Sequence, residues 1–252
     1  LYGYRFRCLV SNGTDTVISA VSILTLPWSQ FSALSARAPA GTGEQTLILG
    51  FVFSGGGKPT LVRGVGPAMA DTVSGYLRDP QLHLFDVSGT EIASNDDWAG
   101  ATDLADAFAR TGAGALDPAS KDAALSGSLT GSVYTAHVRG AGDTTGVALA
   151  EAYDANLVDK TRRLMALSVR NQVGTGADIL IAGFVIAGDT PKRVIVRGVG
   201  PGLSGAVSAY LVDPKVQLYR LKSDGTGWDL VDENDDWDGT PETAAAFASA
   251  GM

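Results

Sequence analysis

The sequence has very few of the residues that build cysteine- or histidine-based sites. Its only cysteine is Cys8, and its two histidines are His83 and His137. A Cys/His zinc site is therefore excluded by number, and a Ser-His-Asp triad would have to use one of the two histidines. Lys and Arg total 19 against 27 Asp and Glu, a net charge of −8, and an acidic surface repels phosphate backbones, so we expect no nucleic-acid partner. No run approaches the roughly 18 apolar residues of a membrane-spanning helix, so no membrane insertion is expected.

Glycine, in contrast, is abundant. It supplies 32 of the 252 residues, well above the usual ~7%, and this excess predicts many tight turns, as in all-β proteins. Hydrophobic residues make up 45% of the chain, enough for one or two domains with real cores. The sequence begins at Leu1 rather than at Met, which indicates a processed product or part of a longer protein.

The sequence contains an internal repeat. Residues 34–67 align with residues 167–201, and more than half of the aligned positions are identical. The match continues through the Asp-Pro pairs at Asp79 and Asp213 and through the NDDW motifs that end at Trp98 and Trp237. Because the period is far too long for a solenoid unit, each copy is predicted to be a complete domain.

The predicted organisation has five parts. Residues 1–26 form a terminal hairpin, 27–33 a linker, 34–155 repeat 1, 156–166 an exposed charged linker, and 167–252 repeat 2. Repeat 2 has no counterpart of residues 122–154 in the sequence and is therefore expected to lack its last strands.

Alternating apolar residues and glycine-rich turns predict eight strands in repeat 1. They are expected at about 34–39, 46–54, 60–65, 81–87, 90–94, 122–130, 133–139 and 146–153. One helix is expected from Thr102 to Thr111, with Leu104 and Phe108 on one face. Short strands with one helix in each copy predict an all-β fold of tandem jelly-roll or immunoglobulin-like β-sandwiches.

Two resemblances support this organisation. The spelling YRFRCLVSNGT in residues 4–14 resembles the last strands of an immunoglobulin-like domain, which implies a partner cysteine for Cys8 on an early strand. Such a partner is absent from the sequence, so Cys8 is either a buried free thiol or paired upstream of Leu1. The pattern LSxR, GTG, GFV, VRGVGP, DP, NDDW and TTGVAL, spread over residues 34–252, resembles a tandem repeat of large secreted proteins from Verrucomicrobia-like bacteria. Residues 79–154 are also similar to bacterial pre-peptidase C-terminal domains. These resemblances imply export and a modular, non-catalytic role.

The acidic loops offer a candidate calcium site, because Ca²⁺ takes six to eight oxygen ligands. The alternative is a structural Asx turn that caps the helix at Thr102. The candidate ligands in the two repeats are Asp79, Asn95, Asp96, Asp97, Asp213, Asn234, Asp235 and Asp236.

Two further residue types recur in both repeats. Trp98 and Trp237 are candidate sugar-binding platforms, with packing beneath the loop as the alternative. Arg63 and Arg197 lie within apolar strands, so each needs a partner, which we expect to be an Asp of the DP or NDDW element.

The leading functional prediction is a non-catalytic extracellular structural or adhesive module, with neighbouring copies or adjacent domains as its partners. Two versions stay open: the chain is part of a long tandem protein, or the hairpin of one subunit completes repeat 2 of the next, head to tail, and builds a filament. The rival prediction is a carbohydrate-binding accessory module of a secreted hydrolase, with a polysaccharide as partner.

Overall fold

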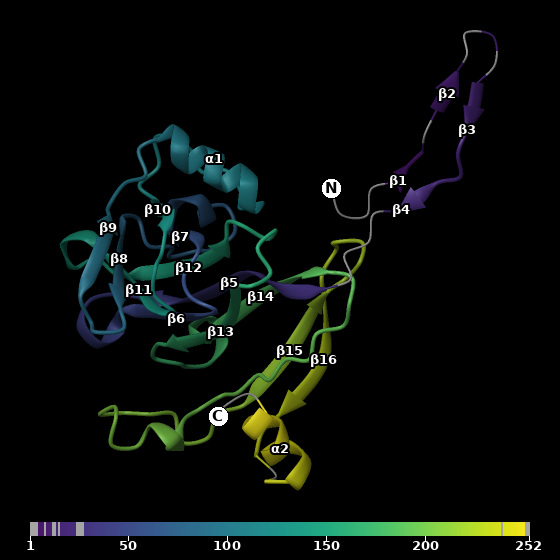
Figure 1. Cartoon of the computed structure of the whole chain (residues 1–252). Coiled ribbons are helices and arrows are strands. Elements are labelled where there is room, and N and C mark those ends of the chain that lie inside the picture. Colours follow the sequence, from purple (N-terminus) through teal and green to yellow (C-terminus); the bar gives the residue numbers. More distant parts are fainter. Residues whose placement is uncertain are drawn as a thin grey trace. The chain divides into compact units, whose positions relative to one another are not determined.

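The computed structural model describes residues 5–7, 9–11, 14, 16–23, 28–237 and 239–249 (Figure 1). The chain divides into unit 1, Leu1–Lys192, and unit 2, Arg193–Met252. This division falls inside repeat 2 rather than in the predicted linker at 156–166, because the first two strands of repeat 2 pair with strands of repeat 1.

The described residues form strands and two α-helices, with short 3₁₀ turns between them. The strands are β1 Arg5–Phe6, β2 Leu9–Ser11, β3 Thr16–Ile18, β4 Ser22–Ile23, β5 Ser29–Ala40, β6 Leu47–Ser54, β7 Pro59–Val65, β8 Pro80–Asp86, β9 Glu91–Asn95, β10 Ala123–Ser128, β11 Val133–Gly140, β12 Gly146–Asp154, β13 Arg163–Arg170, β14 Ile181–Gly188, β15 Val216–Leu221 and β16 Trp228–Asn234. The helices are α1 Thr102–Thr111 and α2 Pro241–Ser249.

The antiparallel sheet of unit 1 has two halves. One half runs β10-β7-β12-β5 and continues to β14, and the other runs β13-β6-β11-β8-β9. The sheet curls so that β7 lies against β8 and β11 against β12. This arrangement confirms the predicted all-β, sandwich-like fold, and all eight strands predicted in repeat 1 are present within a few residues of their expected bounds.

Hydrophobic alternation explains why these strands form. In β8, Leu82 and Leu84 are buried while His83 between them is partly exposed. Helix α1 has the predicted bounds, and it turns Leu104 and Phe108 inward onto a core that also contains Leu61 of β7. The helix ends at Gly112, whose φ of 73° is the left-handed conformation that glycine adopts without strain.

The predicted linkers differ from the structure at both ends of repeat 1. Residues 29–33 belong to β5, which starts at Ser29, so the first strand is longer than expected. Arg163 already belongs to β13, which leaves residues 155–162 as the connection between β12 and β13. Both extensions arise from pairing between the repeats, which local sequence patterns do not reveal.

Two further segments pair locally. In the N-terminal segment, β1 pairs antiparallel with β4 and β2 with β3 over its described residues. Cys8 lies outside the described residues. In unit 2, β15 pairs with β16 and is followed by α2, as β8, β9 and α1 follow one another in repeat 1.

Candidate functional site

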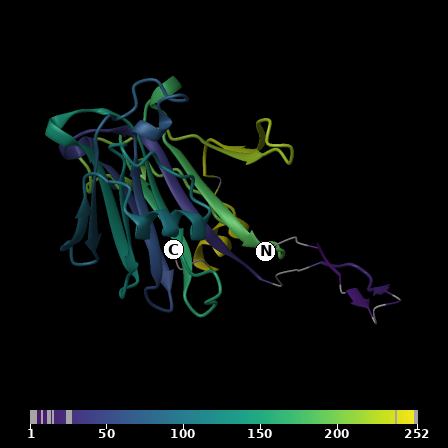
Figure 2. The ribbon, with the colours of Figure 1, turned by 90° about the horizontal axis from the view of Figure 1, so that it is seen from above.

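The first two strands of each repeat pair with those of the other repeat. In repeat 1 these strands are β5 and β6, and in repeat 2 they are β13 and β14, whose residues lie 133 positions further along the sequence. Strand β5 pairs with β14, and β6 pairs with β13 (Figures 1 and 2). We call these two pairings together the exchange seam.

The two pairings of the exchange seam have the same register. Ser35 of β5 is opposite Gly183 of β14, and Ser168 of β13 is opposite Gly50 of β6. Adding 133 to Ser35 and Gly50 gives Ser168 and Gly183, so the second pair is the first with the repeats interchanged. The correspondence holds along both strand pairs.

The irregularities of the seam correspond as well. On the β13 side the register shifts around Met165, and on the β5 side it shifts around the equivalent residue, Ser32. Phe31 and Leu164, which are themselves equivalent, are paired with each other where β5 meets β13. A contact that maps onto itself when its two sides are interchanged is isologous, the geometry of a two-fold axis.

Two glycines allow the strands of the seam to approach. A Cβ atom added to Gly183 would lie 2.7 Å from Oγ of Ser35, and one added to Gly50 would meet Oγ of Ser168 even more closely. Both glycines belong to the GFV motif that recurs in the sequence. The recurrence of this motif therefore has a structural reason at the contact between the repeats.

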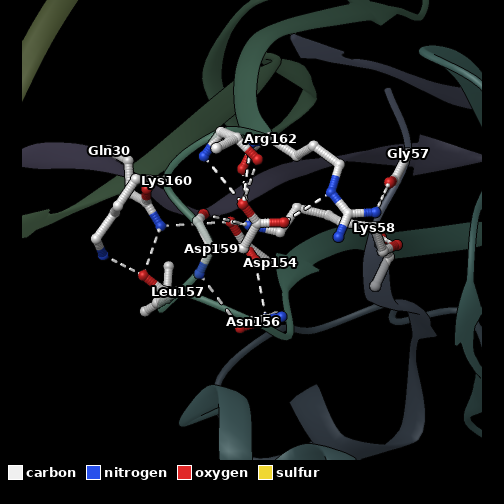
Figure 3. Close-up of polar contacts among 11 residues, drawn as sticks. Gln30, Gly57, Lys58, Asp154, Asn156, Leu157, Asp159, Lys160 and Arg162 are labelled. Atoms are coloured by element: carbon white, nitrogen blue, oxygen red, sulfur yellow. Dashed lines mark hydrogen bonds and ion pairs between the residues drawn. The ribbon is translucent and has the colours of Figure 1, made fainter. Parts of the chain in front are cut away.

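A buried ion pair holds the connection between the repeats. Lys58 and Asp154 have fully buried side chains, and Nζ of Lys58 lies 2.7 Å from Oδ2 of Asp154 (Figure 3). The same ammonium group donates hydrogen bonds to the backbone oxygens of Arg162 at 2.9 Å and Asp159 at 3.3 Å. A buried ammonium group needs this complete set of acceptors, because leaving water is costly for a charge.

Nε2 of Gln30 donates to Oδ2 of Asp154 at 3.5 Å, and we call Gln30, Lys58, Asp154, Asp159 and Arg162 together the linker clamp. The connection itself adds further hydrogen bonds. The guanidinium group of Arg162 donates to the Asp159 carboxylate at 2.6 Å and to the Gly57 oxygen at 2.9 Å. Hydrogen bonds from the Thr161 hydroxyl and the Arg162 guanidinium group hold the pKa of Asp159 well below its usual range. Within this predicted exposed linker, Val158 and Thr161 are exposed, while the Arg162 guanidinium group bonds inward to the backbone of Gly57.

Arg63 has a partner different from the one expected. Its Nε atom donates to Oε2 of Glu151 at 2.7 Å, its Nη2 atom lies 2.6 Å from the same oxygen, and its Nη1 atom donates to the Gly114 backbone oxygen. Arg63 and Glu151 are direct cross-strand partners between β7 and β12, so strand pairing decides the ion pair. The guanidinium group also lies over the Phe108 ring, 5.1 Å from its centroid.

A small hollow of about 240 Å³ lies beside this pair, lined in part by Glu151, Tyr153 and Phe184. Both carboxylate oxygens of Glu151 already accept hydrogen bonds, one from Arg63 and one from the Tyr153 hydroxyl at 2.8 Å. Burial raises the pKa of Tyr153 above its usual value of 10. Glu151 and Tyr153 therefore bond to each other and to Arg63, and these bonds stabilise the fold.

Part of this arrangement recurs in unit 2. Arg197, the equivalent of Arg63, lies over the Phe247 ring, 5.4 Å from its centroid. Phe247 is the equivalent of Phe108. Arg197 itself is exposed. Arg197 therefore contacts an aromatic ring in place of the expected Asp partner. The contact between this arginine and a phenylalanine ring is common to both repeats.

In the candidate calcium loop of repeat 1, a lysine side chain contacts the carboxylates that were expected to bind the ion. Nζ of Lys121 lies 2.8 Å from Oδ2 of Asp97 and 4.0 Å from Oδ2 of Asp79. The hydrogen bond with Asp97 raises the pKa of Lys121. Asn95 ties the loop together, since its side chain donates to the Asp97 oxygen and accepts from the backbone nitrogen of Ala124.

The alternative interpretation also needs correction. The residue that precedes α1, Ala101, makes no side-chain capping bond, so the NDDW loop does not cap the helix. In repeat 2, Asn234 donates to the Asp236 oxygen at 2.9 Å, which repeats the bond of Asn95. Among the described residues, including Asp96, Asp213 and Asp235, no group of three His, Cys, Asp or Glu side chains is arranged to hold a metal ion.

The predicted sugar platform is wrong for Trp98. This side chain is 4% exposed and packs against Phe108, with the ring centroids 5.3 Å apart. Its Nε1 atom donates to the Asp117 oxygen at 2.9 Å. Trp237 is 65% exposed and lies 5.6 Å from the Phe247 ring, the equivalent contact. The motif thus provides a core tryptophan in repeat 1.

The sequence patterns did not point to several residues of the seam, the clamp and the Arg63 ion pair, namely Gly50, Lys58, Glu151, Asp154 and Ser168. A signal for some of them was present. Gly50 and Lys58 recur as Gly183 and Lys192, and Ser168 recurs as Ser35. Residues that recur between two copies without forming a known motif are therefore candidates for the contact between the copies.

Comparison of the chain with known protein families, with curated proteins and with solved structures finds no match. Neither helix in the described part of the chain has the length and apolar character needed to cross a membrane.

Proposed function

We propose that this protein is a non-catalytic structural module of a long extracellular or cell-surface protein, in which successive β-sandwich repeats are fastened to one another by strand exchange. The observation that supports this most strongly is the equal register of β5 with β14 and of β6 with β13. Backbone hydrogen bonds along two strand pairs, β5–β14 and β6–β13, join the repeats far more firmly than a single flexible linker would.

The surroundings of the seam favour the same role. The linker clamp uses a fully buried ion pair to hold the connection in one conformation. Fixing residues 155–162 in this way limits the freedom of one repeat relative to the first strands of the next. The polar and aromatic residues that first suggested chemistry, Asp97 and Trp98, bond to the fold through Lys121 and Asp117.

A nick in the connection tests this function. Val158 is 86% exposed and lies in the connection, so a protease recognition site inserted after it is accessible to cleavage. We expect the two fragments to co-elute after cleavage under native conditions, because β13 and β14 remain paired with β6 and β5. They should separate in denaturant. The same site inserted after Val87, which is 80% exposed and lies at the turn after β8, is the matched control for the insertion.

Fragments that separate without denaturant after the nick at Val158 would contradict the proposal. Extracellular placement has its own test, namely antibody labelling of the protein on intact cells of the source organism. Signal that appears only after lysis would overturn that part.

A further inference from the structure

The exchange seam also defines a surface that fits a second copy of this chain. We infer that β5 and β6 of one chain pair with β14 and β13 of another chain in the register seen within the chain, so that two chains exchange strands and form a dimer. This inference rests on the proposed function, and it names the partner that the seam accepts.

The seam is isologous. Each repeat presents the same two strands, and each pair has the same register, including the irregularities at Ser32 and Met165. The strands therefore recognise an equivalent repeat rather than a particular covalent neighbour. A repeat of a second chain carries the same residues at the same positions.

The two strand pairs of the seam also correspond to two hairpins, β5–β6 and β13–β14, whose second strands have been exchanged. In the seam, Leu34 is opposite Phe184 and Arg37 is opposite Ile181. Because Phe184 and Ile181 are the equivalents of Phe51 and Ile48, the same register within repeat 1 would make a β5–β6 hairpin that turns around residues 41–44.

The connections that would become these turns, between β5 and β6 and between β13 and β14, are already closed by backbone hydrogen bonds. The backbone nitrogen of Gly41 donates to the Gln45 oxygen at 2.9 Å, and that of the equivalent Gly174 donates to the Asp178 oxygen at 2.9 Å. One set of strand contacts can therefore form within a repeat, between repeats of one chain, or between chains. Exchange of identical elements between protomers is a low-cost route to dimers.

Concentration decides between the last two arrangements. The connection at 155–162 keeps the two repeats of one chain at a high effective concentration, so pairing within a chain is favoured in dilute solution. Refolding at high protein concentration favours pairing between chains. A surface layer or fibre of such a protein also places many repeats close together.

A cysteine pair across the seam provides the test. A Cβ atom added to Gly50 lies 3.6 Å from the Ser168 Cβ, within the range of disulfide-bonded pairs. In a Cys8→Ser background, one chain carries Gly50→Cys and the other carries Ser168→Cys. The two are unfolded together, refolded at high concentration and oxidised. We expect at least ten times more disulfide-linked dimer than from a control mixture of Val87→Cys and Ser168→Cys.

The double variant Gly50→Cys, Ser168→Cys in one chain separates the two proposals. Its intramolecular disulfide, without a linked dimer from the mixture, would overturn the exchange between chains and leave the proposed function standing. Absence of that disulfide in a folded double variant would contradict the seam itself.

Isotope mixing decides the question without a change at Gly50. Unlabelled and ¹⁵N-labelled wild-type chains are refolded together at high concentration under reducing conditions, diluted, and weighed by native mass spectrometry. Mixed dimers of about twice 25.9 kDa are expected, and a spectrum of monomers alone would overturn the inference.

Discussion

Replacing Lys58 by Met is the most direct test of the linker clamp. Lys58 and Asp154 are both fully buried and 2.7 Å apart, so the substitution leaves an unpaired carboxylate in the interior. It also removes the hydrogen bonds that Nζ donates to the Asp159 and Arg162 oxygens. Breaking a buried ion pair by removing one partner costs about 3–5 kcal/mol of folding free energy.

This loss can be converted into a melting temperature. For a unit of the size of Leu1–Lys192, 1 kcal/mol corresponds to about 2–4 °C in Tm. We therefore expect Lys58→Met to lower Tm by about 6–20 °C in differential scanning calorimetry. Hydrogen exchange should also become faster in residues 155–162, because the bonds that hold the connection are lost.

Lys121→Met is the matched control. Lys121 also lies 2.8 Å from a carboxylate, that of Asp97, but its side chain is 54% exposed. Exposed ion pairs contribute about 0–1 kcal/mol, so the control should change Tm by no more than about 4 °C. The double variant Lys58→Met, Asp154→Leu should recover part of the loss, because it removes the unpaired charge. Equal effects of Lys58→Met and Lys121→Met would refute the reasoning.

Two further predictions concern the seam and the Arg63 cluster. Gly50→Ala should lower the free energy of unfolding in urea by about 1–3 kcal/mol, because the added Cβ meets Oγ of Ser168. Ser168→Gly in the same chain should restore the stability. The control Gly127→Ala, whose added Cβ meets open space, should change the free energy of unfolding by no more than about 0.5 kcal/mol. Since the pKa of Tyr153 is raised in the folded state, its stabilising contribution is complete below its unfolded pKa of about 10 and is lost as the pH rises further. The Tm should therefore fall from pH 9 to 11 more steeply in wild type than in Tyr153→Phe, and parallel curves would contradict this assignment.

Much of the architecture of repeat 1 is predictable from local patterns. Alternating apolar residues located its strands, and the spacing of Leu104 and Phe108 located α1 with its bounds. Comparing the two copies identified the repeat, because identical positions recur at an almost constant offset. The N-terminal hairpin followed from alternation and a turn, and its described strands pair accordingly.

The candidate sites were less predictable, because a motif does not show what lies next to it in space. Trp98 and the acidic residues around Asp97 suggested a sugar and a calcium ion. Their environment depends on Lys121, Asp117 and Ala124, which come from a later part of the chain. The partner of Arg63 is Glu151, 88 residues away, because strands β7 and β12 pair.

The sequence by itself determined the class of fold, the strands of repeat 1 and the existence of two copies, since these depend on local periodicity and on self-similarity. Only the tertiary structure decided which strands are partners. The residues that set the register of β5 with β14 and of β6 with β13 recur in both repeats, so the sequence pattern alone does not say which repeat supplies the partner strand. In the structure the partner strands come from the other repeat, the connection is clamped by Lys58 and Asp154, and the two repeats meet at Phe31 and Leu164, because these contacts join residues far apart in the sequence.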